Sequence, residues 1–229
     1  MLKQFGPAEF DRPDYVGAAI AQSGALDALV ALERIGARRG FARDDEIYAE
    51  GEVSSSWYRV VSGAVRICKL LPDGRRHIAE FCFAGDCFGL DGGGERAFSA
   101  EAVGEVVLMR YSLRATERLI DQTPQLARKL CEMTLRDLAH AQGRMLLLGR
   151  MTATERVANF LLEMSERRDA QRVVDLPMSR IDIADYLGLT IETVCRTLTA
   201  FKRAGLIAIP NAHRIEFCDR DALSAACEA

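Results

Sequence analysis

Apolar residues follow a strand-like pattern in the first half of the chain. Between Asp45 and Tyr111, short segments rich in Val, Ile, Tyr and Phe alternate with turns that carry Gly or Asp. Such regular spacing is typical of an antiparallel sandwich or roll. At residues 72–75, Pro72 presets its backbone angle and Gly74 permits a positive φ, so we expect a tight hairpin there. The predicted strands cover residues 46–50, 57–63, 64–71, 75–83, 97–103 and 105–111.

Helical spacing flanks this region on both sides. Residues 23–36 and 113–122 each read as a short helix, whereas residues 1–22 contain Pro7, Pro13 and no sustained period. We therefore expect a flexible arm over 1–22 and a β-roll domain over 23–122.

A long helix is predicted over residues 123–150. Thr123 and Pro124 are suited to the N-cap and the first helical position, and only Gly143 interrupts the following residues. Apolar and small residues recur at alternating steps of 4 and 3, which is a heptad seam and predicts dimerisation. The alternative is a helix packed only on its own β-domain, and both can hold if Leu126, Leu130 and Met133 face that domain. The seam consists of Ala127, Cys131, Thr134, Leu138, Ala141, Met145 and Leu148.

The C-terminal region, residues 151–229, has the pattern of a winged helix-turn-helix. Thr152 and Glu155 have capping-box spacing and open an apolar-periodic helix. Further on, Ala184 is small enough for a close helix crossing, Gly188 suits the turn, and Val194 can fill the angle between the two helices. Their 4-then-6 spacing is that of a helix-turn-helix. Two strand-like segments around residues 211–213 predict the wing.

The second helix of this motif carries polar residues on its outer face. A recognition helix enters the major groove with its N-terminal turns. Arg196 can donate to guanine, Glu192 can accept from the cytosine amino group, and Ile191 can touch a thymine methyl group, while Cys195 lies beside them. An exposed polar stripe is also the default for any surface helix. Candidate phosphate contacts are Ser179, Arg180, Thr190, Thr193, Thr199, Lys202 and Arg203.

Composition changes this interpretation only locally. The chain has 229 residues, enough for two domains, and its net charge of −3 provides no overall basic field. Between Pro177 and Arg214, however, five basic residues stand against three acidic ones. The sequence contains no membrane-length apolar run and no secretory signal, so we expect a soluble cytoplasmic protein with seven reduced cysteines.

The stretches FAGDCFG, TATERVANFLL and IADYLGLTIETVCR resemble the CRP/FNR superfamily of regulators, over nearly the whole chain from Leu26. The chain looks most similar to the FixK-type regulators, which relay low-oxygen control. The resemblance implies an α+β fold: an N-terminal antiparallel β-roll like the cyclic-nucleotide-binding domain, a long dimerisation helix and a C-terminal winged helix-turn-helix. It also implies a homodimer that binds a TTG-N8-CAA palindrome and recruits RNA polymerase.

The family's glutamate-x-x-serine-arginine motif matches at Glu192 and Arg196, with Cys195 in place of the serine. Leu90 stands where cyclic-nucleotide binders carry glutamate, and the sequence ERAFSA lacks their Arg-Ser pair, so we expect no cyclic nucleotide. The first cysteine is Cys68, which argues against an N-terminal iron-sulfur cluster. A lone strand histidine, His77, does not predict haem. We therefore expect no cofactor and no metal.

Three further interpretations stay open at this stage. Cys195 lies in the first turns of its helix beside Arg196, where the helix dipole and the cation favour the reactive thiolate. Oxidants are therefore expected to inhibit DNA binding. Cys195 can equally be a passive replacement for serine. Gly85 and Asp86 are candidate polymerase contacts or an ordinary turn. Activation, repression and control by a small molecule are not separated by sequence, whereas no catalytic constellation predicts an enzyme.

Overall fold

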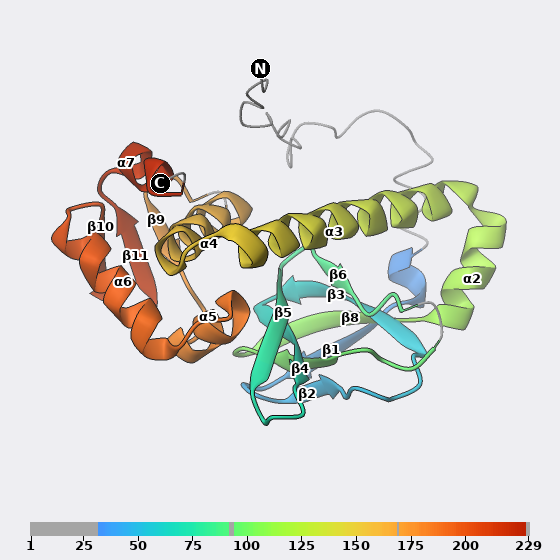
Figure 1. Ribbon diagram of the computed structural model, residues 1–229. Helices are drawn as coiled ribbons and strands as arrows, with labels where there is room; N and C mark the ends of the chain where they lie inside the picture. The colour runs from blue at the N-terminus through green and yellow to red at the C-terminus, as the bar shows by residue number, and fades with distance from the viewer. Residues whose placement is uncertain (1–31, 92–93, 169, 228–229) are drawn as a thin grey trace, which may run out of the picture.

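The computed structural model describes residues 32–91, 94–168 and 170–227. The expected arm over 1–22 lies outside these residues, and of the expected helix over 23–36 only residues 32–35 are described as helical. The described chain forms a β-roll, a long helix that crosses it and a smaller C-terminal domain beside it (Figure 1). Among the described helices, none combines the length and the apolar character that a membrane crossing requires.

The N-terminal domain is the predicted antiparallel roll, built from two four-stranded sheets. One sheet contains, in order, β1 (Ala37–Phe41), β8 (Val106–Ser112), β3 (Ser56–Ser62) and β6 (Cys87–Phe88). The other contains β2 (Glu46–Tyr48), β7 (Ser99–Ala102), β4 (Ala64–Leu70) and β5 (Arg76–Phe83). Val60, Val65 and Leu108 are fully buried between them, because alternate positions of each strand face inward.

The predicted hairpin between β4 and β5 is confirmed. The Leu71 N–H donates to the Arg75 carbonyl at 2.8 Å, and Gly74 has φ +83° as the turn requires. Strands β1 and β6 were not expected from the sequence. β1 is an edge strand in which three of five residues are exposed, so it has no apolar alternation to detect.

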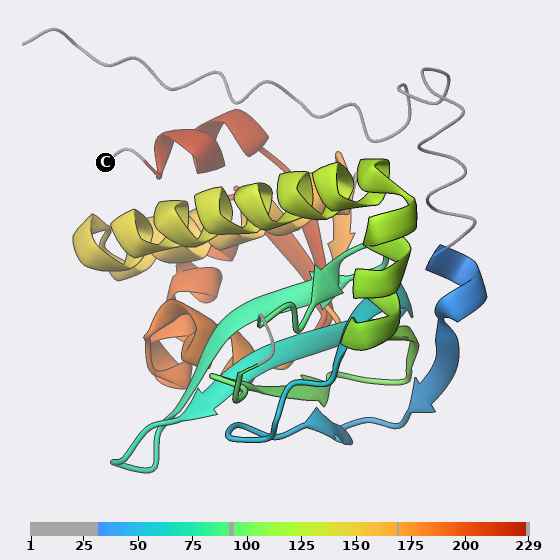
Figure 2. The same ribbon diagram turned by 90° about the vertical axis from the view of Figure 1, so that its right-hand side faces the viewer.

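The short helix α2 (Leu113–Gln122) and the long helix α3 (Pro124–Arg150) have the predicted bounds within one residue. Thr123 and Pro124 take the expected N-cap and first helical positions of α3, but the Thr123 side chain makes no capping hydrogen bond. Its N–H instead donates to the carbonyls of Leu119 and Ile120, so Thr123 closes α2. Figure 2 shows α3 passing over the roll.

One side of α3 packs on the roll, as is required both by a helix packed only on its own β-domain and by one that also dimerises. Leu126 is buried in a cluster with Trp57 and Tyr111, and Leu130 packs against the same cluster. The indole of Trp57 and the ring of Tyr111 are stacked, with centroids 4.3 Å apart. The roll therefore supports the first turns of α3, while four seam residues, Cys131, Thr134, Leu138 and Met145, are exposed.

The C-terminal domain begins with α4 (Ala153–Arg167), whose predicted capping box is present: Thr152 Oγ1 accepts from the Glu155 N–H at 3.3 Å, and the Glu155 carboxylate accepts from the Thr152 N–H. Helices α5 (Arg180–Leu187) and α6 (Ile191–Arg203) follow, and then the hairpin of β10 (Ile207–Asn211) and β11 (Arg214–Phe217). Two elements were not predicted: β9 (Val173–Asp175), which pairs with β11, and α7 (Arg220–Ala225), capped by Asp219.

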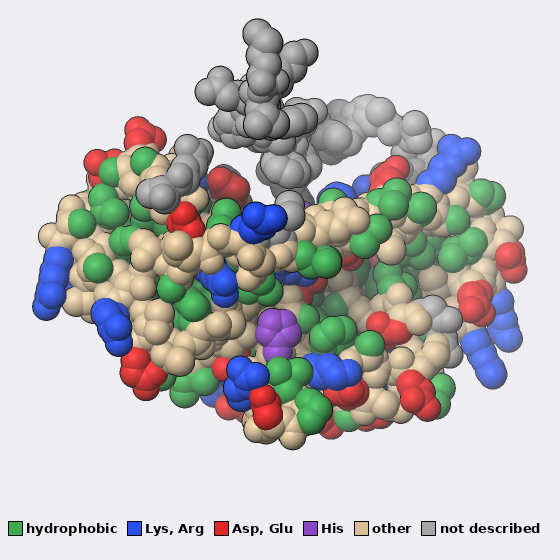
Figure 3. All heavy atoms as spheres, in the orientation of Figure 1, with side chains coloured by type: hydrophobic (Ala, Val, Ile, Leu, Met, Phe, Trp, Pro, Cys, Tyr) green, Lys and Arg blue, Asp and Glu red, His purple; other side chains and the backbone are tan. Residues whose placement is uncertain are grey.

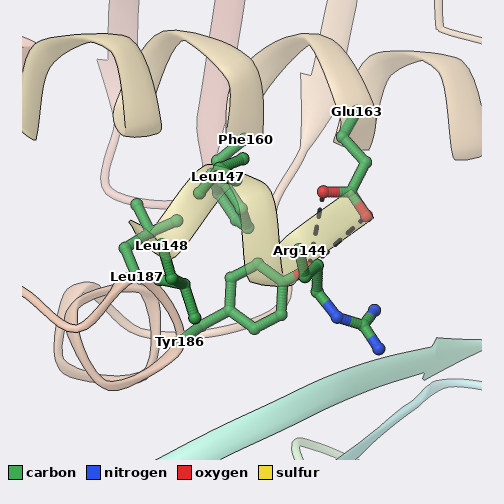
Figure 4. Close-up of a pocket in the computed structure, with 7 residues that line it drawn as sticks. All are labelled: Arg144, Leu147, Leu148, Phe160, Glu163, Tyr186 and Leu187. Carbon is green, nitrogen blue, oxygen red and sulfur yellow. Dashed lines mark hydrogen bonds between the residues drawn. The ribbon is translucent and has the colours of Figure 1, made fainter. Parts of the chain in front are cut away.

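One apolar cluster spans the roll and the C-terminal domain. Ile78, Phe81 and Phe83 of the roll belong to the same buried cluster as Ile183 and Leu187 of α5. At the junction of α3, α4 and α5, side chains of all three helices meet, and Tyr186 points toward Glu163 (Figure 4). The C-terminal domain is therefore docked on β5.

Candidate nucleic-acid interface

Helices α5 and α6 form the predicted helix-turn-helix. Ser179 caps α5: its Oγ accepts from the Asp182 N–H at 3.1 Å, and its own N–H donates to Asp182 Oδ2 at 2.9 Å. Gly188 ends α5 at φ +62°, ψ 38°, a left-handed conformation that favours glycine. Val194 is fully buried, as expected of the residue that plugs the angle between the two helices.

Helix α6 has one buried and one exposed face. Thr190 caps it, because its Oγ1 accepts from the Thr193 N–H at 3.3 Å. Val194, Leu198 and Phe201 are buried in the domain core. The four expected base-reading residues all lie on the exposed face: Ile191, Glu192, Cys195 and Arg196.

Charge on this face suits hydrogen bonding to base edges. The backbone N–H of Glu192 and the Thr190 hydroxyl hold the pKa of the Glu192 carboxyl below its usual value, and Arg196 adds to this effect. The Glu192 side chain is therefore an ionised acceptor at neutral pH. Lys202 and Arg203 are exposed in the last turn of α6, and Figure 3 shows basic side chains at this end of the molecule.

The other residues expected to contact phosphates differ in exposure and in whether their hydroxyl groups are already hydrogen-bonded. Thr190 and Thr199 are exposed and Thr193 is half-buried, but the Thr199 hydroxyl donates to the Cys195 carbonyl at 2.8 Å. The Ser179 hydroxyl donates to Asp182 Oδ2 at 2.8 Å and so serves the capping box.

Arg180 is less accessible than sequence analysis assumed. Its Nη1 is buried and has no hydrogen-bond partner among the described residues. Burial lowers the pKa of Arg180, and the neighbouring Cys195 side chain acts in the opposite direction. A phosphate contact through this group requires the side chain to turn outward, which would give the buried N–H groups acceptors.

The predicted wing is present beside α6. Gly205 follows the last helical turn with φ +73°, and its N–H donates to the Lys202 carbonyl at 3.1 Å. β10 and β11 then pair antiparallel, and β9 extends this sheet on the far side of β11. Arg214, counted among the basic residues of this region, forms a bidentate pair with Asp175 at 2.7 and 3.0 Å, so its charge is already balanced.

The interior of the roll contains an arginine that the sequence interpretation did not single out. Arg96 is buried, and its guanidinium donates to the Gly89 carbonyl at 2.8 Å, to the Ser56 carbonyl and to the Asp91 carboxylate. The guanidinium carbon also lies 4.0 Å from the centroid of the Tyr48 ring. Three of its five N–H donors are therefore used within the protein, and the Asp91 carboxylate supplies a counter-charge.

Two candidate protein-contact surfaces lie away from α6. Of the α3 seam, Cys131, Thr134, Leu138 and Met145 are exposed and Ala127, Ala141 and Leu148 are half-buried. At the β5–β6 turn, Gly85 is exposed, but Asp86 Oδ2 accepts from Arg167 Nη2 at 2.7 Å and from the Phe83 N–H at 2.7 Å. The Asp86 carboxylate is thus already engaged within the chain.

The cysteines divide into buried and exposed thiols. Cys68 and Cys82 are buried in the roll and Cys87 is half-buried, as expected for strand residues. Cys218 follows β11 and is exposed. Cys195 is exposed in the middle of the candidate interface.

Comparison with known proteins agrees with this architecture. Residues 155–226 match the family profile of the Crp-like helix-turn-helix domain, and residues 38–123 match that of the cyclic nucleotide-binding domain. The chain is 45% identical over 190 residues to the nitrogen fixation regulation protein FixK of Bradyrhizobium diazoefficiens, covering 80% of each chain. It is 40% identical over 201 residues to the transcriptional activatory protein AadR of Rhodopseudomonas palustris, covering 85% of this chain and 84% of that one.

The solved structure of FixK2 from Bradyrhizobium japonicum is similar to that of this chain. Its TM-score is 0.82 at 43% sequence identity, and the match covers 85% of this chain and 98% of that one.

Proposed function

This chain belongs to the CRP/FNR family of transcription regulators and is FixK-like within it, and on that premise we propose that it activates transcription from a palindromic promoter site that it binds as a homodimer. Two relatives named above are a nitrogen fixation regulator and a transcriptional activator, which supports activation and, with the FixK likeness, control of genes used at low oxygen.

The single observation that carries this proposal is the placement of Glu192 and Arg196. Both are exposed on α6 while Val194 and Leu198, on the opposite face, are buried, so the domain core anchors the helix. Arg196 would donate two hydrogen bonds to guanine O6 and N7, and Glu192 would accept from the cytosine amino group. Ile191 and Cys195 would contact the neighbouring bases. The proposed site is of the TTG-N8-CAA type, with Cys195 in the position of the family's serine.

Contacts to the sugar-phosphate backbone would fix the register of α6 without reading sequence. Thr190, Thr193, Lys202 and Arg203 border the reading face and are the best placed for this role, and Thr199, Ser179 and Arg180 complete the proposed set. Because the whole chain carries net negative charge, attraction to DNA depends on these few cations.

The homodimer would form along α3. Leu138 and Met145 are 53% and 73% exposed on a 27-residue helix, although they lie on the apolar seam. A second copy of the chain would bury them by the same seam, and two recognition helices related by a two-fold axis would match a palindrome. Recruitment of polymerase would involve Gly85 and Asp86 in this turn. The Asp86 carboxylate, N–H and carbonyl are all hydrogen-bonded within the chain, so Asp86 would mainly hold the turn in shape.

The internal pairing of Arg96 favours DNA binding that needs no effector in the roll. We propose that the freshly purified protein binds its site without an added ligand. Cys195, exposed among the base-reading residues, is proposed as the point at which oxidants weaken binding.

Selection from random duplexes tests the proposal directly. The purified chain should enrich two inverted half-sites with a fixed spacer, and promoter activity in a reporter strain should rise when the chain is expressed. Enrichment of no common sequence would overturn the DNA-binding assignment, and enrichment of an isolated half-site would overturn the dimer.

A further inference from the structure

The helix-turn-helix does not stand free of the roll, because α5 lies along β5. The rings of Phe81 on β5 and Tyr186 on α5 have centroids 5.2 Å apart and are inclined at 44°. Figure 1 shows α5 beside β5, with α6 on the side away from the roll. The docking therefore uses the first helix of the motif and leaves the reading face of the second one open.

Two arginines of the roll face the carboxylates of α5. Arg76 Nη2 donates to Asp182 Oδ1 at 2.6 Å, and Arg76 Nε donates to Asp185 Oδ2 at 2.8 Å. Arg66 Nη1, from β4, approaches Asp182 Oδ1 at 3.4 Å. Arg66 is in turn held by Glu101, with Nε 2.7 Å from Oε2, and by Asp44, with Nη2 2.9 Å from Oδ1.

Asp182 belongs at once to the local structure of α5 and to the contact with the roll. Oδ2 accepts from Ser179 in the capping box, and Oδ1 accepts from the roll arginines. Its side chain is only 6% exposed, so an unpaired carboxylate here would carry a large desolvation cost. The pairing with Arg76 and Arg66 offsets part of that cost, which ties the N-terminal turn of α5 to this place on the roll.

We propose that Arg76, supported by Arg66, is a positioning residue for DNA recognition: by holding Asp182 and Asp185 it sets the direction in which α6 projects from the roll. This inference rests on the proposed function and deepens it. Since α5 and α6 pack rigidly through Val194 and the Gly188 turn, a tilt of α5 on β5 becomes a tilt of α6. In a dimer, such a tilt changes the separation of the two reading heads.

The spacer between half-sites is therefore the sensitive measurement. A protein whose heads are held in one direction should discriminate strongly between palindromes that differ by one base pair in the spacer. If the direction of α6 is not fixed, binding to the palindrome with the correct spacer should be weaker. Only a fraction of the dimers then has both recognition helices placed for binding at any time. Binding to a single half-site should change little.

Arg76→Gln is the test variant and Arg75→Gln is its matched control. Arg75 is the preceding residue, lies in the hairpin turn with a 78% exposed side chain, and pairs only with Asp73 among the described residues. For Arg76→Gln we expect about a tenfold loss of affinity on the preferred palindrome, as for a competent fraction of about one tenth, and a smaller penalty for altered spacers. Arg75→Gln should behave as the parent protein does.

Arg76→Lys keeps the charge but offers a compact ammonium in place of the planar fork that meets two carboxylates. Arg76→Lys should show an intermediate loss of spacer discrimination. It replaces Arg76→Gln as the test variant if the glutamine variant does not fold. The proposal is overturned if the folded variants keep the parent's spacer preference, or lose affinity equally on all spacers and on the half-site. Failure of the parent protein to bind any duplex would instead refute the proposed function.

Discussion

The phenol of Tyr186 on α5 donates a hydrogen bond to the carboxylate of Glu163 on α4, with its oxygen 3.4 Å from Oε2 (Figure 4). Arg167 Nη1 lies 3.7 Å from the other carboxylate oxygen. Burial raises the pKa of Glu163, although Arg167 and Arg144 oppose the rise. The carboxyl group is therefore easier to protonate in the folded protein than in the unfolded chain.

This shift predicts a pH dependence of stability. Glu163 contributes stability that is fully present below the ordinary pKa of an unfolded glutamate and is lost as the pH rises through its raised folded value. Glu163→Gln imitates the protonated form, so its free energy of unfolding relative to the parent should increase with pH across that window. Urea unfolding at successive pH values measures this difference. The control is Glu166→Gln on the same helix, whose side chain is 73% exposed; parallel curves for Glu163→Gln and the parent would contradict the prediction.

The two kinds of cation on α6 should have separable effects on DNA binding. Arg196→Ala should lower affinity by about 1 to 3 kcal/mol and relax the preference at one G·C pair. Lys202→Ala should weaken all sequences alike and reduce the slope of log affinity against log salt by about 1. Fluorescence anisotropy on the selected site and its single-base variants measures both. A uniform loss in Arg196→Ala would remove that residue from base reading.

The exposed seam of α3 predicts a dimer that single charges can disrupt. Leu138→Glu should yield monomers, because burying each leucine stabilises the interface by about 1.5 to 3 kcal/mol and a buried unpaired carboxylate adds a further cost. Leu135→Glu is the matched control, since Leu135 is similarly exposed at 59% but lies off the seam. Light scattering after size-exclusion chromatography measures the mass. A dimer of unchanged stability in Leu138→Glu would rule out the proposed seam.

Oxidation of Cys195 should weaken DNA binding. A sulfenic or higher acid at this position adds bulk or negative charge beside the base edges and phosphates. Peroxide treatment should therefore reduce operator affinity of the parent protein by about tenfold or more, as for a loss of 1.4 kcal/mol, and leave Cys195→Ser nearly unaffected. Cys218→Ser, which removes another exposed thiol, should stay as sensitive as the parent. Equal inhibition of Cys195→Ser would exclude this cysteine as the site.

Features that depend on neighbouring residues were readily predicted from sequence. The caps at Ser179 and Thr190 and the turn at Gly188 each act within a few positions, so spacing alone locates α5 and α6. The β4–β5 hairpin is equally local. β9 was missed because only one of its three residues is buried, and it gains its partner from β11 some 40 residues later.

The contacts that position the site could not be derived from sequence. The sequence pattern explains Asp182 fully as part of a capping box, so it gives no sign that Asp182 also contacts the roll. Its partners Arg76 and Arg66 lie 106 and 116 residues away on strands whose register is set by the roll. Likewise, Arg180 fits the pattern of a surface cation, and only the packed structure reveals that part of its guanidinium is buried.

The way in which Thr123 joins the two helices has a mechanical consequence. Because one residue both closes α2 and precedes Pro124, no flexible linker separates the two helices, and α3 would carry a tilt of α2 along its length. At 1.5 Å per residue its 27 residues span about 40 Å, so a rotation of one degree at this pivot moves the far end by about 0.7 Å. In a dimer, a small rotation at the junction between α2 and α3 would therefore produce a larger change in the distance between the two C-terminal domains.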